Sequence, residues 1–166
     1  MGHGPRYQVP FRRRREGRTD FHQRFTLVSS GRDRLIVRKS LKHMIVQIAQ
    51  ARREGDSILV SSHSRELKGH GWDRATSNIP AAYLTGYLCG LRAKKSGIET
   101  AVLDLGLQRI IPGSRIFAAL AGAVDAGLQI PLSEEVLPPE KRRQGTHIGA
   151  ESLFSAVRKK IEEAET

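Results

Sequence analysis

The first half of the chain alternates apolar and polar positions in a way that predicts three β-strands. The strands cover residues 34–39, 44–49 and 57–62, each rich in Ile, Val and Leu, with successive side chains on opposite faces. Short turns at residues 40–42 and 54–56 separate them. Strands joined by such short turns pair with their neighbours in opposite directions. We therefore expect an antiparallel meander.

A helix–strand–helix passage follows the meander. Residues 78–95 are apolar almost all round, with Ser77 or Asn78 as the N-cap. Residues 100–105 form a continuous apolar run, which suits a buried parallel strand. Residues 114–126 predict a second apolar helix. The predicted fold class is α/β, with a mixed sheet flanked by helices.

Two features concern the packing of this domain. Gly86 and Gly90 lie in the first of the two helices, and we expect them to let that helix sit close on the sheet. Residues 63–77 form a long polar loop that holds the lone Trp72. Loops of this length are often functional, but Trp72 could equally plug one end of the core. The sequence leaves both interpretations open.

The two ends of the chain have a different character. Residues 1–18, with Pro5, Pro10 and a run of four arginines, are expected to be extended or disordered alone in water. Residues 19–28 predict a short helix that docks an apolar stripe on the domain, and residues 151–163 predict a charged tail helix. We expect three units, with boundaries at residues 1–26 (basic arm with a short helix), 27–137 (globular α/β domain) and 138–166 (linker and C-terminal helix).

Basic residues are concentrated at the front of the chain. Residues 6–43 hold twelve of the 28 Lys and Arg residues and three acidic residues, so this stretch carries +9 of the net +11. Clustered bases indicate a polyanionic partner, which could be nucleic acid, an anionic membrane or an acidic protein. Tyr7, Phe11, Phe21 and Phe25 lie among these arginines, and this favours RNA because unpaired bases stack on aromatic rings. Membrane binding would need a lipidation signal or a basic amphipathic helix, and neither is evident.

Catalytic and metal-binding patterns are not evident in the sequence. The six histidines include no H-x-x-x-H or H-E-x-x-H pattern, so we expect no metal site and no cofactor. Cys89 is interpreted as a small buried hydrophobe, and Asp104 as a structural acid near a helix N-terminus. The alternatives are a metal-dependent nuclease centred on Asp104, or a generic polyanion-binding or DNA-binding protein. A single cysteine and the lack of a membrane-spanning run predict a soluble, cytoplasmic protein.

Four stretches of the sequence resemble one protein family. They are GPRY at 4–7 with RRRRE at 12–16 and TD at 19–20; RL at 34–35 with RKS at 38–40 and KH at 42–43; NIPAAYLTG at 78–86; and VLDLGL at 102–107 with PGS at 112–114. In this order they resemble the universal large-subunit ribosomal protein family numbered eighteen, in its archaeal form, which is related to the eukaryotic 5S-rRNA-binding ribosomal protein. Leu41 and Asp33 depart from the Asn and Pro that are usual there.

The resemblance implies a role and a set of contacts. It implies a non-enzymatic structural protein of the ribosome that binds 5S rRNA and large-subunit (23S-type) rRNA in the central protuberance, beside neighbouring ribosomal proteins. It also implies an α/β domain of ribonuclease-H-like topology without catalysis. Carried over residue by residue, the implied RNA contacts are Arg6, Tyr7, Arg12, Arg13, Arg14, Arg15, Arg18, Arg24, Arg34, Arg38, Lys39, Ser40, Lys42 and His43.

Overall fold

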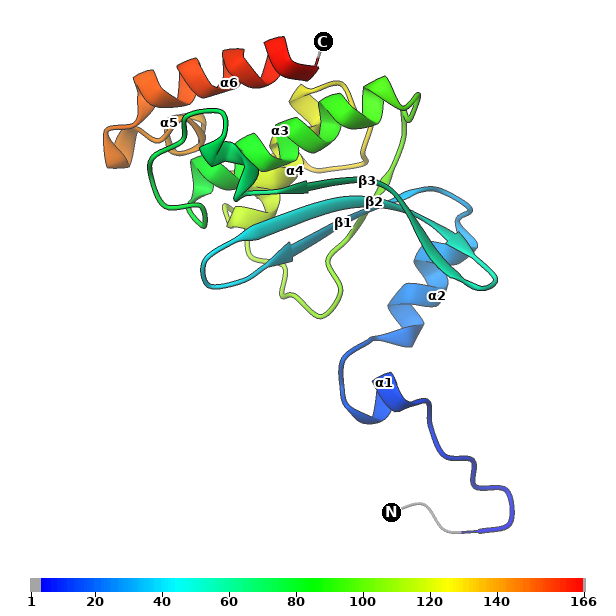
Figure 1. Ribbon diagram of the computed structural model, residues 1–166. Helices are drawn as coiled ribbons and strands as arrows, with labels where there is room; N and C mark the ends of the chain where they lie inside the picture. Colours follow the sequence, from blue (N-terminus) through cyan, green and yellow to red (C-terminus); the bar gives the residue numbers. More distant parts are fainter. Residues whose placement is uncertain (1–3, 166) are drawn as a thin grey trace.

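The computed structural model describes residues 4–165 of the chain (Figure 1). Residues 1–3 of the predicted arm and residue 166 of the predicted C-terminal segment lie outside the described residues. In chain order the elements are α1 (Arg12–Arg15), α2 (Phe21–Ser29), β1 (Arg34–Lys39), β2 (Met44–Arg52), β3 (Gly55–His63), the 3-10 helix η1 (Glu66–Lys68), α3 (Ile79–Lys95), β4 (Val102–Asp104), α4 (Arg115–Asp125), the 3-10 helix η2 (Glu134–Val136), α5 (Glu140–Gln144), the 3-10 helix η3 (Thr146–Ile148) and α6 (Glu151–Glu165).

The four strands form one mixed sheet in the order β3-β2-β1-β4. β1, β2 and β3 are an antiparallel meander, whereas β4 runs parallel to β1. The predicted α/β class, the meander and the parallel fourth strand are therefore confirmed. Leu35 and Val37 alternate with Ile36 along β1, and only the first two are fully buried. The sheet thus has one face against the core and one face that is open over much of its area.

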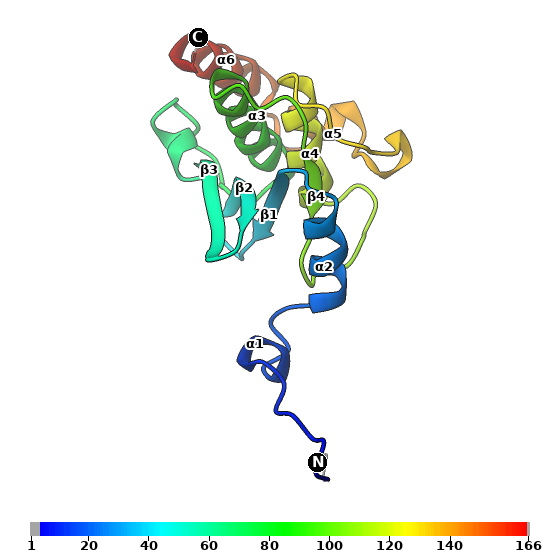
Figure 2. The same ribbon diagram turned by 90° about the vertical axis from the view of Figure 1, so that its right-hand side faces the viewer.

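Helices α3 and α4 cover the buried face of the sheet, as Figure 2 shows. The side chain of Asn78 caps α3 by accepting a hydrogen bond from the Ala81 N–H, 2.9 Å away. The predicted role of Gly86 needs correction, because its close neighbour is α4 and not the sheet. A Cβ at Gly86 would lie 1.9 Å from the carbonyl oxygen of Ala119. The absence of a side chain therefore allows the backbones of the two helices to touch.

The C-terminal part of the chain packs on the other side of α3. Phe154, Val157 and Ile161 of α6 are at most 5% exposed and belong to the same core as the sheet. Trp72 is 1% exposed and donates its indole N–H to the Ala75 carbonyl at 3.1 Å. This confirms that Trp72 plugs one end of the core. In residues 4–165, no helix combines the length and the apolar character needed to cross a membrane.

The N-terminal helices differ from the prediction in three ways. Residues 12–15 form one helical turn, α1, within the stretch expected to be extended. Asp20 caps α2 by accepting from the backbone N–H groups of His22 and Gln23, so the helix begins at Phe21, two residues after the predicted start. The predicted apolar stripe of α2 is also wrong as a docking face, because Phe25 is 72% exposed. An ion pair from Arg24 to Asp56 sets how α2 lies against the domain.

Candidate nucleic-acid interface

A network of ion pairs between arginines and aspartates joins α2 to the open face of the sheet. Arg34 lies at the start of β1 and is only 1% exposed. Its NH1 is 3.0 Å from Asp104 Oδ2 on β4, and its NH2 is 2.7 Å from Asp56 Oδ1 on β3. Burying a guanidinium is tolerable only when carboxylates neutralise it. Arg34 was predicted to contact RNA, but the fold places it inside, where it cannot reach a phosphate without leaving both carboxylates.

Arg38 lies four residues further along the same face of β1 and is partly accessible. Its guanidinium donates to the Asp104 carbonyl at 2.8 Å and to Asp104 Oδ1 at 2.9 Å. Gly106 has a positive φ of 59°, and a Cβ there would lie 2.9 Å from Arg38 NH2. The glycine therefore lets the guanidinium lie flat on the loop after β4. With 40% of its side chain exposed, Arg38 can still present N–H groups to a ligand.

Arg24 completes this network of ion pairs at the tip of the β2–β3 hairpin. Its NH2 lies 3.0 Å from both carboxylate oxygens of Asp56. Burial by itself would raise the pKa of Asp56, but the bonds and charges of Arg34 and Arg24 outweigh it and lower the pKa. The carboxylate is thus held ionised between two cations. Through this pair, α2 is fixed to the domain and directs the preceding residues away from it, as Figure 1 shows.

The segment before α2 presents its cations to solvent. All four arginines of α1 are exposed, and Arg14 and Arg15 have no carboxylate partner among residues 4–165. Glu16 partly offsets the repulsion, since it lies 3.8 Å from Arg12 and 3.1 Å from Arg18. The first backbone hydrogen bonds of α1 are made to the Phe11 carbonyl, which accepts from the N–H groups of Arg14 and Arg15 at 3.0 Å. This local bonding explains the helical turn that charge repulsion alone argued against.

Aromatic rings are exposed beside these arginines. Tyr7 is 52% exposed, Phe11 77% and Phe25 72%. Phe11 packs loosely on Phe21, with ring centroids 6.1 Å apart. Exposed rings among unpaired arginines are suited to stacking with unpaired bases, while the guanidinium groups bind phosphates.

The turn between β1 and β2 carries the last of the predicted contacts. Ser40 closes the turn, because its Oγ accepts from the His43 N–H at 2.9 Å and lies 3.0 Å from the His43 carbonyl. Its role is therefore structural. Lys42 is exposed, and Lys39 is half-buried at the end of β1. The His43 Nδ1 lies 3.0 Å from the Thr76 hydroxyl, so its ring is held against the loop after β3.

Apart from Ser40 and His43, which hold the turn, the predicted contacts separate into three groups by their environment. Those that are accessible and lack a carboxylate partner among residues 4–165 are Arg6, Tyr7, Arg14, Arg15, Lys39 and Lys42. A second group of arginines each contacts a polar or acidic side chain and yet remains accessible, at least in part. These are Arg12, Arg13, Arg18, Arg24 and Arg38. The buried Arg34 supports the surface from inside. Sequence reasoning missed that Asp56 and Asp104 organise the arginines, since both pairings join residues far apart in the chain.

Comparison with known proteins places the chain in a family. A family model described as "Ribosomal large subunit proteins 60S L5, and 50S L18" matches residues 5–99 and 92–133. The chain belongs to this family. A relative named "Large ribosomal subunit protein uL18" in Methanothermobacter thermautotrophicus is 57% identical over 155 residues, which is 92% of this chain and 81% of the relative.

Two more relatives of the same name extend the comparison. That of Aeropyrum pernix is 54% identical over 156 residues, or 92% of this chain and 73% of the relative. That of Haloarcula marismortui is 53% identical over 148 residues, or 89% of this chain and 79% of the relative. The resemblance to the archaeal form of the family, drawn from four short stretches, is confirmed.

The family consists of structural ribosomal proteins and not of enzymes. Asp104 is a structural acid as expected, but two arginines and the Gly106 N–H hold it, and no helix begins there. Within residues 4–165, no three His, Cys, Asp or Glu side chains are grouped to hold a metal ion. Burial raises the pKa of Cys89 to about 12, so its thiol stays protonated and is a poor nucleophile. The family to which the chain belongs argues against the nuclease hypothesis.

Proposed function

We propose that this chain binds 5S rRNA and helps attach it to large-subunit (23S-type) rRNA in the central protuberance, beside neighbouring ribosomal proteins. As a member of the family, the chain is a structural constituent of the large ribosomal subunit and is located in the ribosome, in the cytoplasm. The observation that carries the proposal is the exposed arginine–aromatic segment at residues 6–18, which projects away from the α/β domain. Residues 1–26 act in this proposal as an arm, and the domain behind it positions the arm.

The accessible and partly accessible cations are the proposed contacts, and the buried Arg34 is the proposed support. Arginines of α1 match phosphate oxygens bidentately. Tyr7 and Phe11 offer rings on which unpaired bases can stack, each stack contributing about 1–3 kcal/mol. Arg38 exposes 40% of its side chain and can join them without leaving Asp104. An exposed segment next to the accessible Arg38 on the sheet suits an RNA that offers both loops and helical grooves.

The test is the salt dependence of 5S rRNA binding. We would replace the four arginines of α1 by glutamine and measure Kd from about 50 to about 400 mM salt. Each lost phosphate contact should reduce the log–log slope by about 0.7–0.9, so the variant should lose about 3 in slope. The matched control replaces Lys94, Lys95, Lys141 and Arg142, which are exposed on α3 and α5. Equal slopes for the variant and the control would refute the proposal.

Competition with duplex DNA separates this function from generic polyanion binding. Labelled 5S rRNA is bound to the protein, and either unlabelled 5S rRNA or random duplex DNA is added at the same phosphate concentration. If the protein is adapted to 5S rRNA, the duplex DNA should displace far less of the labelled RNA. Equal competition by both nucleic acids at moderate salt would favour the generic alternative.

A further inference from the structure

The end of β3 lies beside the turn that follows β1. In the β2–β3 ladder His63 is opposite Ile45, so the loop after His63 starts next to the turn. The rings of His43 and His63 have centroids 4.9 Å apart. Thr76, at the far end of the loop, donates its hydroxyl to the Lys42 carbonyl at 2.7 Å. Turn and loop are therefore joined at both ends and form one surface.

Three cationic side chains surround the histidine pair. Lys42, Arg65 and Lys68 are exposed, and none has a carboxylate partner among residues 4–165. Partial burial and the positive charges of His63, Arg65, Lys68 and Lys42 together lower the pKa of His43. Each of these charges acts on the His43 ring, so together they create a positive potential where the turn meets the loop.

The acid in this loop does not neutralise these cations. Glu66 lies between Arg65 and Lys68 in sequence, yet its Oε2 is 2.8 Å from Arg92 NH2 on α3. Its Oε1 accepts from the His63 N–H at 2.7 Å. Both oxygens of the carboxylate therefore face the domain. The 3-10 helix η1 thus directs the carboxylate of Glu66 toward the domain and leaves Arg65 and Lys68 exposed to solvent.

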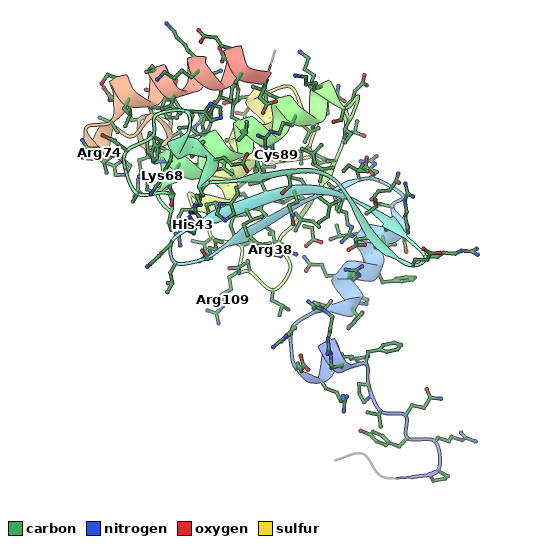
Figure 3. The ribbon with its side chains drawn as sticks, viewed as in Figure 1. Arg38, His43, Lys68, Arg74, Cys89 and Arg109 are labelled. Atoms are coloured by element: carbon green, nitrogen blue, oxygen red, sulfur yellow. The ribbon has the colours of Figure 1, made fainter. Side chains whose placement is uncertain are left out.

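This cluster lies at the end of the sheet opposite the arm. β1 runs from α2 to the turn, and six residues of strand span about 17 Å. In Figure 3, His43, Lys68 and Arg74 lie together at this end, while α2 lies at the other. Arg38 and Arg109 lie between them on the side of the sheet away from α3. A separation of this size exceeds the screening length of about 8 Å at physiological salt, so charges at the turn interact only weakly with those of α1 and α2.

We propose that Lys42, Arg65 and Lys68 form a second phosphate-binding site, which binds the RNA backbone at the end of the sheet opposite the arm. This turn–loop site rests on the RNA-binding function proposed above. Lys42 was among the sequence-predicted contacts, whereas Arg65 and Lys68 were not. RNA is the partner that fits best, because the chain belongs to a ribosomal protein family and a backbone phosphate supplies a compact anion to each cation.

The alternative of an ordinary solvated surface fits these observations less well. Solvated lysines usually alternate with acids or lie on mobile side chains with no fixed surroundings. Here the backbone beneath the cations is held, since the Arg65 N–H donates to His63 Nδ1 at 2.9 Å and Thr76 ties the loop to the turn. Like charges gathered on a fixed surface repel one another until an anion binds.

The experiment compares two double variants of the full chain. Arg65→Gln with Lys68→Gln removes two charges from the turn–loop site but leaves the arm intact. Lys94→Gln with Lys95→Gln removes two exposed charges at the end of α3 and serves as the control. Binding to 5S rRNA is measured from about 50 to about 400 mM salt. The first variant should lower the log–log slope by about 1.4–1.8 and weaken binding at least about tenfold at low salt, while the control should match the unmodified chain.

A charge-conserving variant distinguishes the loss of positive charge from damage to the fold at these two positions. Arg65→Lys with Lys68→Arg should bind nearly as tightly as the unmodified chain, because it retains both positive charges. If Arg65→Gln with Lys68→Gln binds like the control while the α1 variant is weakened, the turn–loop site is refuted and the proposed function stands. If the unmodified chain does not bind 5S rRNA at all, the proposed function fails as well.

Discussion

Asp104→Ala should destabilise the fold by about 3 kcal/mol. The carboxylate is 9% exposed, and it accepts from Arg34 at 3.0 Å, Arg38 at 2.9 Å and the Gly106 N–H at 2.8 Å. Removing one partner of a buried ion pair costs about 3–5 kcal/mol. The lower end applies because Arg34 keeps Asp56, and because Arg38 is 40% exposed and can be rehydrated.

Urea unfolding measures this loss of stability directly, provided that the dependence of the unfolding free energy on urea concentration is the same in both proteins. With a slope of about 2 kcal/mol per molar urea, the midpoint should fall by about 1.5 M. Asp73→Ala is the control, because Asp73 is 72% exposed and lies 3.6 Å from Arg74, and its removal should change stability by less than about 0.5 kcal/mol. Adding Arg34→Met to Asp104→Ala should restore part of the loss, since it removes a buried guanidinium that has lost one of its two carboxylates, while Asp56 keeps its ion pair with Arg24. A loss at Asp104 no larger than at Asp73 would refute the buried-network interpretation.

Three further outcomes follow from the structure. Gly86→Ala should cost at least about 1–3 kcal/mol in chemical unfolding, because its Cβ would lie 1.9 Å from a backbone oxygen, whereas Gly69→Ala, with its nearest atom at 3.3 Å, should be tolerated. The pKa of His43 is lowered from 6.5 by partial burial and neighbouring cations, so the unfolded chain takes up a proton first as the pH falls. Stability should therefore decrease below about pH 6.5, and less so in His43→Gln; an NMR titration midpoint of His43 at or above 6.5 would contradict this. The Cys89 thiol, with a pKa of about 12, should react with a thiol reagent at about pH 8 only after unfolding, and rapid labelling of the native protein would show that it is accessible.

Local patterns predicted the secondary structure well where neighbouring residues decide it. The predicted strand at residues 34–39 has the bounds of β1, and Asn78 caps α3 as expected. β2 and β3 extend beyond their predicted ends, to Arg52 and from Gly55. The tip of the β2–β3 hairpin is polar and has no alternation of apolar and polar residues, so the sequence pattern does not show that the two strands continue to pair there. The β-bulge between Ile48 and Ala49 is likewise a property of the pair of strands.

The charged residues of the interface were predictable as a set but not in their individual roles. A run of arginines among aromatics indicates RNA whatever the fold. Whether one arginine faces solvent depends on what covers it. Arg34 and Arg38 share a face of β1, yet Arg34 lies between Asp56 and Asp104 and is buried, while Arg38 is half-exposed. Nothing within a few residues of Arg34 signals this, because both carboxylates belong to other strands.

The sequence by itself determined the α/β class, the family and the concentration of positive charge at the front of the chain. These depend on composition, on the periodicity of apolar residues and on short motifs, all of which are local. Only the tertiary structure decided which cations remain available for a ligand. Strand pairing brings His63 beside the turn after β1 and so joins Arg65 and Lys68 to Lys42, and it encloses Arg34 between carboxylates. Electrostatic interactions act through space, so a basic surface is defined only when distant segments of the chain have been brought together.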